Sequence, residues 1–475
     1  MKFTSLAFVV FLPLMFLFYW RINTTKGKNA LLVLGSIIFY SWWDWRFTGL
    51  LGISILVDYF AALNIERSKS LITKKKFVLF SIAVNIGLLF VFKYFNFFAN
   101  EFISSAAILG WQIEPITAQI ILPMGISFYT FQSLSYTIDV YKKEISATND
   151  IISFIAFITF FPQLVAGPIE KASSLLTQLE ENRIFKYLEA RDGLKQILWG
   201  VFLKLIIADR CAPIANNVFQ NYSSLNSIDL LIGTLAFSLQ IYGDFAGYSH
   251  IAIGTAKLFG IKLSDNFLTP YFSQSIIDFW RRWHITLMRW LKDYIYIPLG
   301  GSRKGSLIQI RNILFVFILS GIWHGANWTF IIWGIYNGIL VSINNLLLSY
   351  TKLGVFEIKK FNLNISNLIY TILTFSFVSI GWIIFRSESI NDAFEFFRQF
   401  FMSFSLTPSI DYSLTTVSLS LAFILIEGYN MNKSFPLENI ETILKPFYRY
   451  TIYTLIVMII LFSKIESQEF IYFQF

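Results

Sequence analysis

Long apolar runs separated by short polar loops follow one another along almost the whole chain. A run of about 17 to 25 residues is long enough for a helix to cross the hydrocarbon core of a bilayer. We find such runs near residues 5–20, 30–45, 47–63, 77–99, 117–138, 151–167, 194–208, 229–249, 311–329, 330–349, 368–385, 414–429 and 449–463. The pattern predicts an all-α polytopic membrane protein with about 11–13 transmembrane helices.

The hydropathy falls between residues 250 and 310. Within this stretch, residues 278–305 place Arg281, Arg282 and further charges among aromatic side chains, which is too much charge for a helix that faces lipid. The segment predicts an amphipathic interfacial or re-entrant element shielded by protein. Its basic residues have two interpretations: an anchor at the cytoplasmic membrane surface, or a clamp for the phosphates of a cytosolic acyl donor.

Composition agrees with a membrane environment. Of the 475 residues, 55% are hydrophobic and 14% are charged, whereas soluble proteins carry roughly a quarter charged residues. The apolar runs leave no stretch for an extramembrane catalytic domain, so we expect a single integral-membrane domain over residues 1–475. The lone cysteine, Cys211, excludes an intrachain disulfide.

The net charge of +9 follows the loops between the runs. Loops 21–28, 64–76 and 431–449 are rich in Lys and Arg, whereas loop 100–115 contains neither. Because short basic loops stay on the cytoplasmic side, both termini are predicted to be extracytoplasmic. The excess of basic residues therefore indicates membrane lipid as a partner and gives no reason to invoke nucleic acid.

The three histidines, His250, His284 and His324, all lie in or beside apolar segments. An ionisable side chain at membrane depth is costly unless it faces a cavity, so each is a candidate functional residue. His250 is expected in a Gly-rich turn after Asp244. Because no two histidines are three or four positions apart, we predict no metal site.

His324 lies in the segment LSGIWHGANWTFIIWG, where Trp323 and Asn327 are expected to wall a site. A low-dielectric wall would keep the imidazole neutral and able to take a proton from a hydroxyl. The alternative is a hydrogen-bonded histidine that packs helices together. His284, beside Arg281 and Arg282, is likewise either a catalytic group or a polar anchor at the membrane interface.

The chain ends on IESQEFIYFQF, with four aromatic residues among the last six. Such a terminus is expected to dock on the protein rather than extend into water. Tyr472 is then either an aromatic anchor at the membrane interface or a nucleophile that a base inside the protein activates.

Five segments carry more specific motifs. They are LPMGISFYTFQSLSYTIDVYK at 122–142, FFPQLVAGPIE at 160–170, GYSHIAIG at 247–254, DFWRRWHITLMRWLKDYIYIPLGGSRKG at 278–305 and GIWHGANWTFIIWG at 321–334. In this order, over roughly residues 120–340, they resemble the signature core of the membrane-bound O-acyltransferase (MBOAT) family. The branch is that of bacterial alginate and peptidoglycan O-acetyltransferase membrane subunits. His250 departs from the branch, which usually has aspartate there.

The resemblance implies a ring of helices around a central channel, completed by the C-terminal span 449–463 and the tail 464–475. His324 matches the family's central catalytic histidine and His284 its second signature histidine. Tyr472 matches the tyrosine of an F-x-Y-x-x-F ending, which is thought to carry the acyl group. The expected contacts with the acyl donor are Arg281, Arg282, Trp323 and Asn327.

The expected function is therefore transmembrane O-acetylation of a cell-envelope polysaccharide such as alginate or peptidoglycan, in the bacterial inner membrane. Acetyl-CoA is the expected cytosolic donor, and a separate extracytoplasmic O-acetyltransferase the expected partner. One alternative is D-alanyl transfer from a carrier protein to teichoic acid. Others are a transporter, which would predict internal repeats that we do not find, and a non-catalytic scaffold.

Overall fold

The computed structural model describes residues 1–114, 120–351, 365–431, 433–463 and 468–473. Within these residues the regular elements are helices, accompanied by an isolated antiparallel bridge between Phe267 and Trp283. Among them, six helices or helix runs are long and apolar enough to cross a membrane: α3 (Arg46–Arg67), α4 to α5 (Leu71–Ile108), α11 (Ser227–Leu258), α14 (Ser306–His324), α15 (Trp328–Thr351) and α16 (Ile365–Arg386). Shorter apolar helices are α1 (Leu6–Arg21), α18 (Leu414–Tyr429) and α19 (Pro446–Phe462). The predicted all-α polytopic membrane fold is confirmed.

Some predicted spans are not single membrane-length helices. The span 151–167 is wrong as a continuous helix, because α7 (Ile151–Thr159) stops before Pro162 and turns follow to Gly167. Proline removes a backbone donor and clashes with the preceding turn, which favours the end of the helix before Pro162. The first three residues of the span 117–138 lie outside the described residues, and the helix there, α6 (Ile126–Lys142), begins after Gly125.

The described chain divides into two compact units. Unit 1 comprises residues 1–194 and 252–264, and unit 2 comprises residues 195–251 and 265–475. Unit 1 contains α1 to α7, with α2 at Thr25–Ser41, α4 at Leu71–Leu89, η1 at Phe90–Tyr94, α5 at Phe95–Ile108, and also α8 at Ala172–Glu180.

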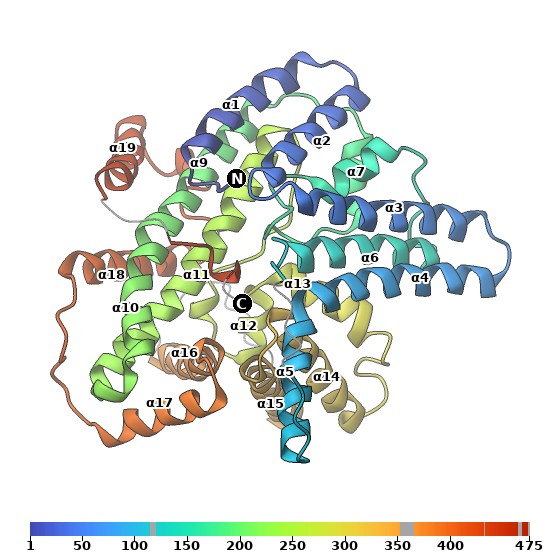
Figure 1. Ribbon diagram of the computed structural model, residues 1–475. Helices are drawn as coiled ribbons and strands as arrows, with labels where there is room; N and C mark the ends of the chain where they lie inside the picture. Colours follow the sequence, from blue (N-terminus) through green and yellow to red (C-terminus); the bar gives the residue numbers. More distant parts are fainter. Residues whose placement is uncertain (115–119, 352–364, 432, 464–467, 474–475) are drawn as a thin grey trace. The chain divides into compact units, whose positions relative to one another are not determined.

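In unit 1, α3, α6 and α4 run side by side (Figure 1) around a buried carboxylate. Asp58 on α3 is fully buried. It accepts hydrogen bonds from Asn85 Nδ2 at 2.8 Å and Thr137 Oγ1 at 2.9 Å, and also from Ser81 and Ser133. A carboxylate inside a helix bundle must be satisfied by such donors. The cluster therefore ties the three helices together.

The break after α7 packs inside unit 1, as its polar residues require. Residues 161–170 are all buried. Gln163 donates to Gln132 on α6, and Glu170 accepts from the backbone N–H of Ser264.

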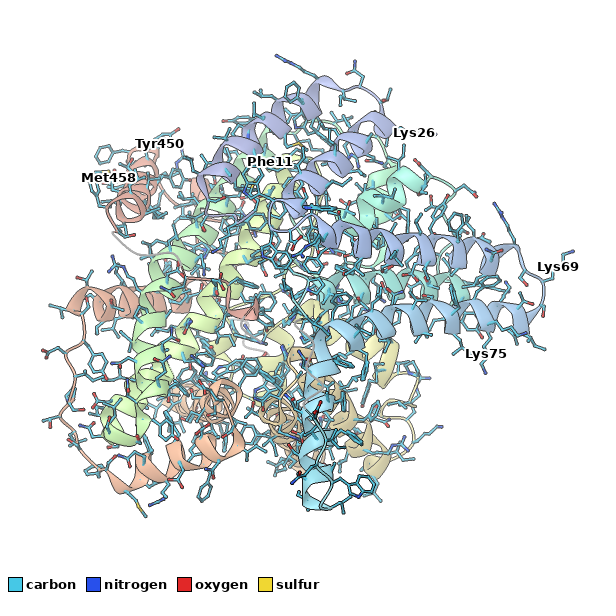
Figure 2. The ribbon with its side chains drawn as sticks, in the orientation of Figure 1. Phe11, Lys26, Lys69, Lys75, Tyr450 and Met458 are labelled. Atoms are coloured by element: carbon cyan, nitrogen blue, oxygen red, sulfur yellow. The ribbon has the colours of Figure 1, made fainter. Side chains whose placement is uncertain are left out.

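The basic residues predicted for the loops of unit 1 lie at or near the ends of its helices, and most of them are exposed. Lys26, Lys69 and Lys75 are exposed and extend from the ends of α2, α3 and α4 (Figure 2). Lys28, predicted as a loop residue, instead lies in α2 and is buried, where its Nζ donates to the carbonyl of Arg183 at 2.7 Å. The predicted loops are too long, because α2 already begins at Thr25 and α4 at Leu71, so that Lys26, Lys28 and Lys75 are helical.

Unit 2 holds the remaining elements. They are α9 (Tyr187–Phe202, from Lys195), η2 (Leu203–Ala208), α10 (Asp209–Gln220), η3 (Tyr222–Ser224), α11 to Ile251, η4 (Pro270–Phe272), α12 (Ile276–Arg282), α13 (Ile285–Leu291), η5 (Lys292–Tyr296), α14 to α16, α17 (Ile390–Met402), α18, η6 (Ile440–Thr442), α19 and η7 (Ile471–Phe473). The π-helical η2 joins α9 to α10 inside the predicted span 194–208.

Helices α14 and α15 of unit 2 form a tightly packed hairpin. Close packing depends on glycine, because a Cβ at Gly321 would overlap the carbonyl oxygen of Phe330 and one at Gly334 would overlap that of Phe317. The two glycines therefore allow the backbones of α14 and α15 to approach closely. The hairpin places His324 at the end of α14, facing α15.

Residues 278–305 form short helices rather than a span, as predicted. Helix α12 ends at Arg282, and α13 begins after His284, whose backbone is left-handed with φ 46°. A left-handed residue cannot continue a right-handed helix. The break directs the side chain of His284 into the interior of unit 2, where it is 1% exposed.

Candidate active site

His324 lies in an aromatic shell. Its imidazole ring centroid is 4.9 Å from that of Trp323, 5.1 Å from Trp333 and 5.4 Å from Phe385, each with its ring turned edge-on. These residues come from α14, α15 and α16, and His324 itself is buried. The shell excludes water and leaves a polar group at the end of an otherwise apolar helix hairpin.

Tyr472 is brought to this shell from the far end of the sequence. Its ring centroid lies 5.6 Å from that of His324 and 4.5 Å from that of Phe245 on α11. Phe470 stacks on Tyr472 at 5.7 Å. The predicted docking of the C-terminal aromatic segment is thus seen for the described residues 468–473, and residues 474 and 475 lie outside the described chain.

His284 also lies near Trp323, with 5.8 Å between the ring centroids. Its ring also meets Phe245 at 4.7 Å. The structure therefore brings together all three predicted catalytic residues: Trp323 contacts both histidines, and Phe245 contacts both His284 and Tyr472.

The hydrogen bond of His284 fixes which ring nitrogen carries the proton. His284 Nδ1 lies 3.1 Å from Oδ1 of Asn266, which also accepts from the Thr286 hydroxyl at 2.9 Å and from the Thr286 backbone N–H. An amide oxygen only accepts, so neutral His284 is protonated at Nδ1 and its basic nitrogen is Nε2. Asn266 is a residue that sequence reasoning missed, since nothing in the local sequence indicates this contact.

Burial sets the protonation states. It lowers the pKa of His284 to about 3, so the imidazole is neutral at physiological pH. It raises the pKa of the Tyr472 phenol well above its ordinary value of 10.0, so the phenol keeps its proton. A neutral phenol is a poor nucleophile and needs a base beside it to react.

The predicted donor-contacting residues are placed differently from one another. Trp323 is buried between the two histidines. Asn327 donates from Nδ2 to the carbonyl of Glu388 at 2.8 Å and accepts from the backbone N–H of Thr329, so its amide holds the start of α15. Arg282 Nε donates to Asp278 Oδ1 at 2.9 Å, and Arg281 is exposed at the end of α12. Their contact with an acyl donor stays a prediction.

His250 is not in a turn, as the sequence analysis expects, but within the continuous helix α11. The glycines near it are helical and serve packing: Gly247 lies against the backbone of Gly200 on α9. His250 Nδ1 is 3.2 Å from Nε2 of Gln196, and its ring lies 6.2 Å from Phe435. These surroundings differ from the Trp323 shell that contacts the other two histidines.

A charged cluster that contacts the docked C-terminal segment was also not predicted from the sequence. Lys204, Asp209 and Asp244 are buried together, and Asp244 Oδ2 accepts the backbone N–H of Ile471 at 2.7 Å. The available signal was a lysine inside an apolar run, since an ionisable residue at membrane depth is a functional candidate by default.

An apolar cavity of about 460 Å³ lies elsewhere in unit 2, between α11, α16 and α18. Tyr242 and Glu427 contribute to its wall, and the Tyr242 hydroxyl donates to Glu427 Oε2 at 2.6 Å. Its lining includes none of His284, His324 and Tyr472.

Comparison with known proteins identifies the family. The model of the membrane-bound O-acyltransferase family (MBOAT) matches residues 37–385. The chain is 36% identical over 445 residues to a probable alginate O-acetylase, AlgI, of Azotobacter vinelandii, covering 91% of this chain and 85% of that protein. It is 36% identical to a peptidoglycan O-acetyltransferase of Helicobacter pylori, covering 82% and 77% of the two chains. A teichoic acid D-alanyltransferase of Bacillus subtilis is 30% identical over 56% of this chain and 69% of its own length.

Three observations agree with one another. The described residues contain six membrane-length apolar helices, a buried histidine lies in an aromatic shell, and the family model matches most of the sequence. This chain belongs to the membrane-bound O-acyltransferase family and is a multi-pass membrane O-acyltransferase.

Proposed function

We propose that the protein transfers an acetyl group from acetyl-CoA to Tyr472, with His324 as the general base. The observation that carries this proposal is the 5.6 Å separation of the Tyr472 and His324 rings inside a buried aromatic shell. The proximity of two residues so distant in the sequence supports their assignment as nucleophile and base.

The transfer needs no reactant besides the thioester and the two side chains. A ring nitrogen of His324 takes the phenol proton as the Tyr472 oxygen attacks the thioester carbonyl, and a phenyl acetate ester forms. The carbon–sulfur bond of the thioester breaks, and the leaving thiolate takes the proton from His324 to give free CoA. The water-excluding shell protects the ester from hydrolysis.

Acetyl is proposed as the acyl group because relatives that match most of this chain are named as a probable alginate O-acetylase and a peptidoglycan O-acetyltransferase. Arg281 and Arg282 are proposed to hold the donor phosphates, with Trp323 and Asn327 walling the acyl site. The D-alanylating relative is similar over a smaller share of this chain. D-alanyl transfer from a carrier protein is therefore the second candidate.

The acetyl group is proposed to continue from Tyr472 to a separate O-acetyltransferase that modifies an envelope polysaccharide. The names of the relatives support a polysaccharide O-acetylation system. We propose a bacterial inner-membrane location with both termini extracytoplasmic. Exposed Lys69 after α3, and Lys75 and Lys76 near the start of α4, support a cytoplasmic side for this turn.

The test is single-turnover labelling of the purified protein with acetyl-CoA labelled in the acetyl group. Wild type should carry the label on Tyr472, and His324→Ala and Tyr472→Phe should carry none. If wild type stays unlabelled but releases CoA to an added alcohol, transfer is direct and the tyrosine step is wrong. Labelling from a D-alanyl carrier protein, but not from acetyl-CoA, would support the second candidate.

A further inference from the structure

The buried cluster of Lys204, Asp209 and Asp244 is an ion group in which one cation serves two carboxylates. Lys204 Nζ lies 2.8 Å from Asp244 Oδ1 and 2.9 Å from Asp209 Oδ1. The residues come from η2, α10 and α11, and the two aspartates are at most 2% exposed. Burying such charges costs several kcal/mol per ion, and packing α10 against α11 would not by itself require them.

The C-terminal segment completes this cluster through its backbone. Lys204 Nζ donates to the carbonyl of Gln468 at 3.1 Å, so the three acceptors Asp209, Asp244 and Gln468 match the three protons of the ammonium group. Asp244 uses its other oxygen, Oδ2, to accept the backbone N–H of Ile471 at 2.7 Å. A donor and an acceptor of the cluster thus each bind one group of the segment.

Two side chains of the segment add apolar contacts. Ile471 is 1% exposed, and Phe470 packs its ring 5.1 Å from Tyr248 and 6.0 Å from Phe245. The hydrogen bond to Ile471 fixes the residue directly before Tyr472. Since a shift by one residue would move the phenol out of the His324 shell, the cluster sets the register of the nucleophile.

We propose that Lys204, Asp209 and Asp244 form a docking site for a peptide segment, the backbone of Gln468–Ile471, and that this site positions Tyr472 against His324. The three are positioning residues, because they act on the reaction through the backbone of the segment. The role of the site in acyl transfer rests on the proposed function, whereas the docking itself does not.

The test replaces the whole charged group, because removing one partner would leave buried charges uncompensated. The main variant is Lys204→Met with Asp209→Asn and Asp244→Leu. The matched control is Lys195→Met with Glu441→Gln, which neutralises another ion pair of unit 2, with 2.9 Å between Nζ and Oε1. Asp244→Asn serves as a milder variant should the triple variant fail to fold, as judged by size-exclusion chromatography in detergent.

Two readouts are compared. The first is trimming of the C-terminus through Tyr472 by a carboxypeptidase, followed by intact-mass spectrometry. The second is the acetyl label on Tyr472 relative to CoA release to an added alcohol. In the triple variant we expect trimming at least about tenfold faster and labelling at least about tenfold lower, because two charge-assisted hydrogen bonds are lost. Because His324 is unchanged in the triple variant, an added alcohol that enters the place vacated by the Tyr472 phenol should still release CoA, and the control should match wild type.

Trimming at the wild-type rate in the folded variants would overturn the docking site. Faster trimming with unchanged labelling would overturn the positioning role. If wild type itself took no label, the proposed function would fail, while the trimming comparison would still decide whether the cluster docks the segment.

Discussion

The ring of Tyr472 lies 5.6 Å from the ring of His324, and both rings are in contact with an aromatic shell that includes Phe245 and Trp323. The described C-terminal segment, residues 468–473, thereby lies beside His324. If the proposed relay holds, the chain supplies the acceptor hydroxyl itself.

Replacement of His324 should reduce activity far more than replacement of another buried histidine, His250. We expect His324→Gln to lower CoA release from acetyl-CoA by at least about 100-fold, because the general base is lost. The matched control is His250→Gln, since His250 contacts Gln196 and Phe435 rather than the Trp323 shell. CoA release is measured with a thiol reagent, and equal losses in the two variants would argue against a special role for His324.

The hydroxyl and the ring of Tyr472 should have separable effects. Tyr472→Phe keeps the ring contacts with Phe245 and Phe470, so we expect no labelling but wild-type protection of the C-terminus from carboxypeptidase. Tyr472→Ala should lose both the label and the protection, because the ring that contacts Phe245 and Phe470 is removed. Label retained in Tyr472→Phe and mapped elsewhere would show that another group accepts the acetyl.

The neutral His284 should make the protein sensitive to mild acid. Burial lowers its pKa from 6.5 to about 3, so between these values the unfolded state binds a proton that the folded state does not. Stability is therefore complete above pH 6.5 and declines as the pH falls towards 3. At pH 5 the free energy of unfolding is therefore lower than at neutral pH by roughly 2 kcal/mol.

The measurement compares thermal unfolding of wild type and His284→Gln in detergent from pH 7 to pH 5. Because the carboxylates are common to both proteins, their titration cancels in the difference. As the pH falls, the unfolding temperature of His284→Gln should rise relative to that of wild type. A difference that is independent of pH would mean that folding leaves the pKa of His284 unchanged.

Packing of the α14–α15 hairpin should tolerate no side chain at Gly321. We expect Gly321→Ala to cost about 1–3 kcal/mol, because the added methyl overlaps the carbonyl of Phe330 and helices must separate. Gly87→Ala on α4 is the control, since a methyl there meets no atom within 4 Å. Thermal unfolding of both variants gives the comparison, and equal stability would argue against close packing at Gly321.

Much of this protein follows from its sequence. The apolar runs determine that the chain is a helical membrane protein, because backbone groups in lipid must be satisfied within the segment. The charge of residues 278–305 determines that they do not span, and the structure has short helices there. The five motifs, including the one around His324, indicate the family, because their glycines, aromatic and charged residues are local features that single segments display.

Tertiary structure decided what depends on contacts between distant segments. Asn266 orients His284, and Lys204, Asp209 and Asp244 bind the backbone before Tyr472. No local sequence pattern predicts these contacts, because each residue acquires its role only from a partner that is distant in the sequence. The sequence names the histidine and the tyrosine, but only the packing of α11, α14 and the C-terminal segment brings their rings together.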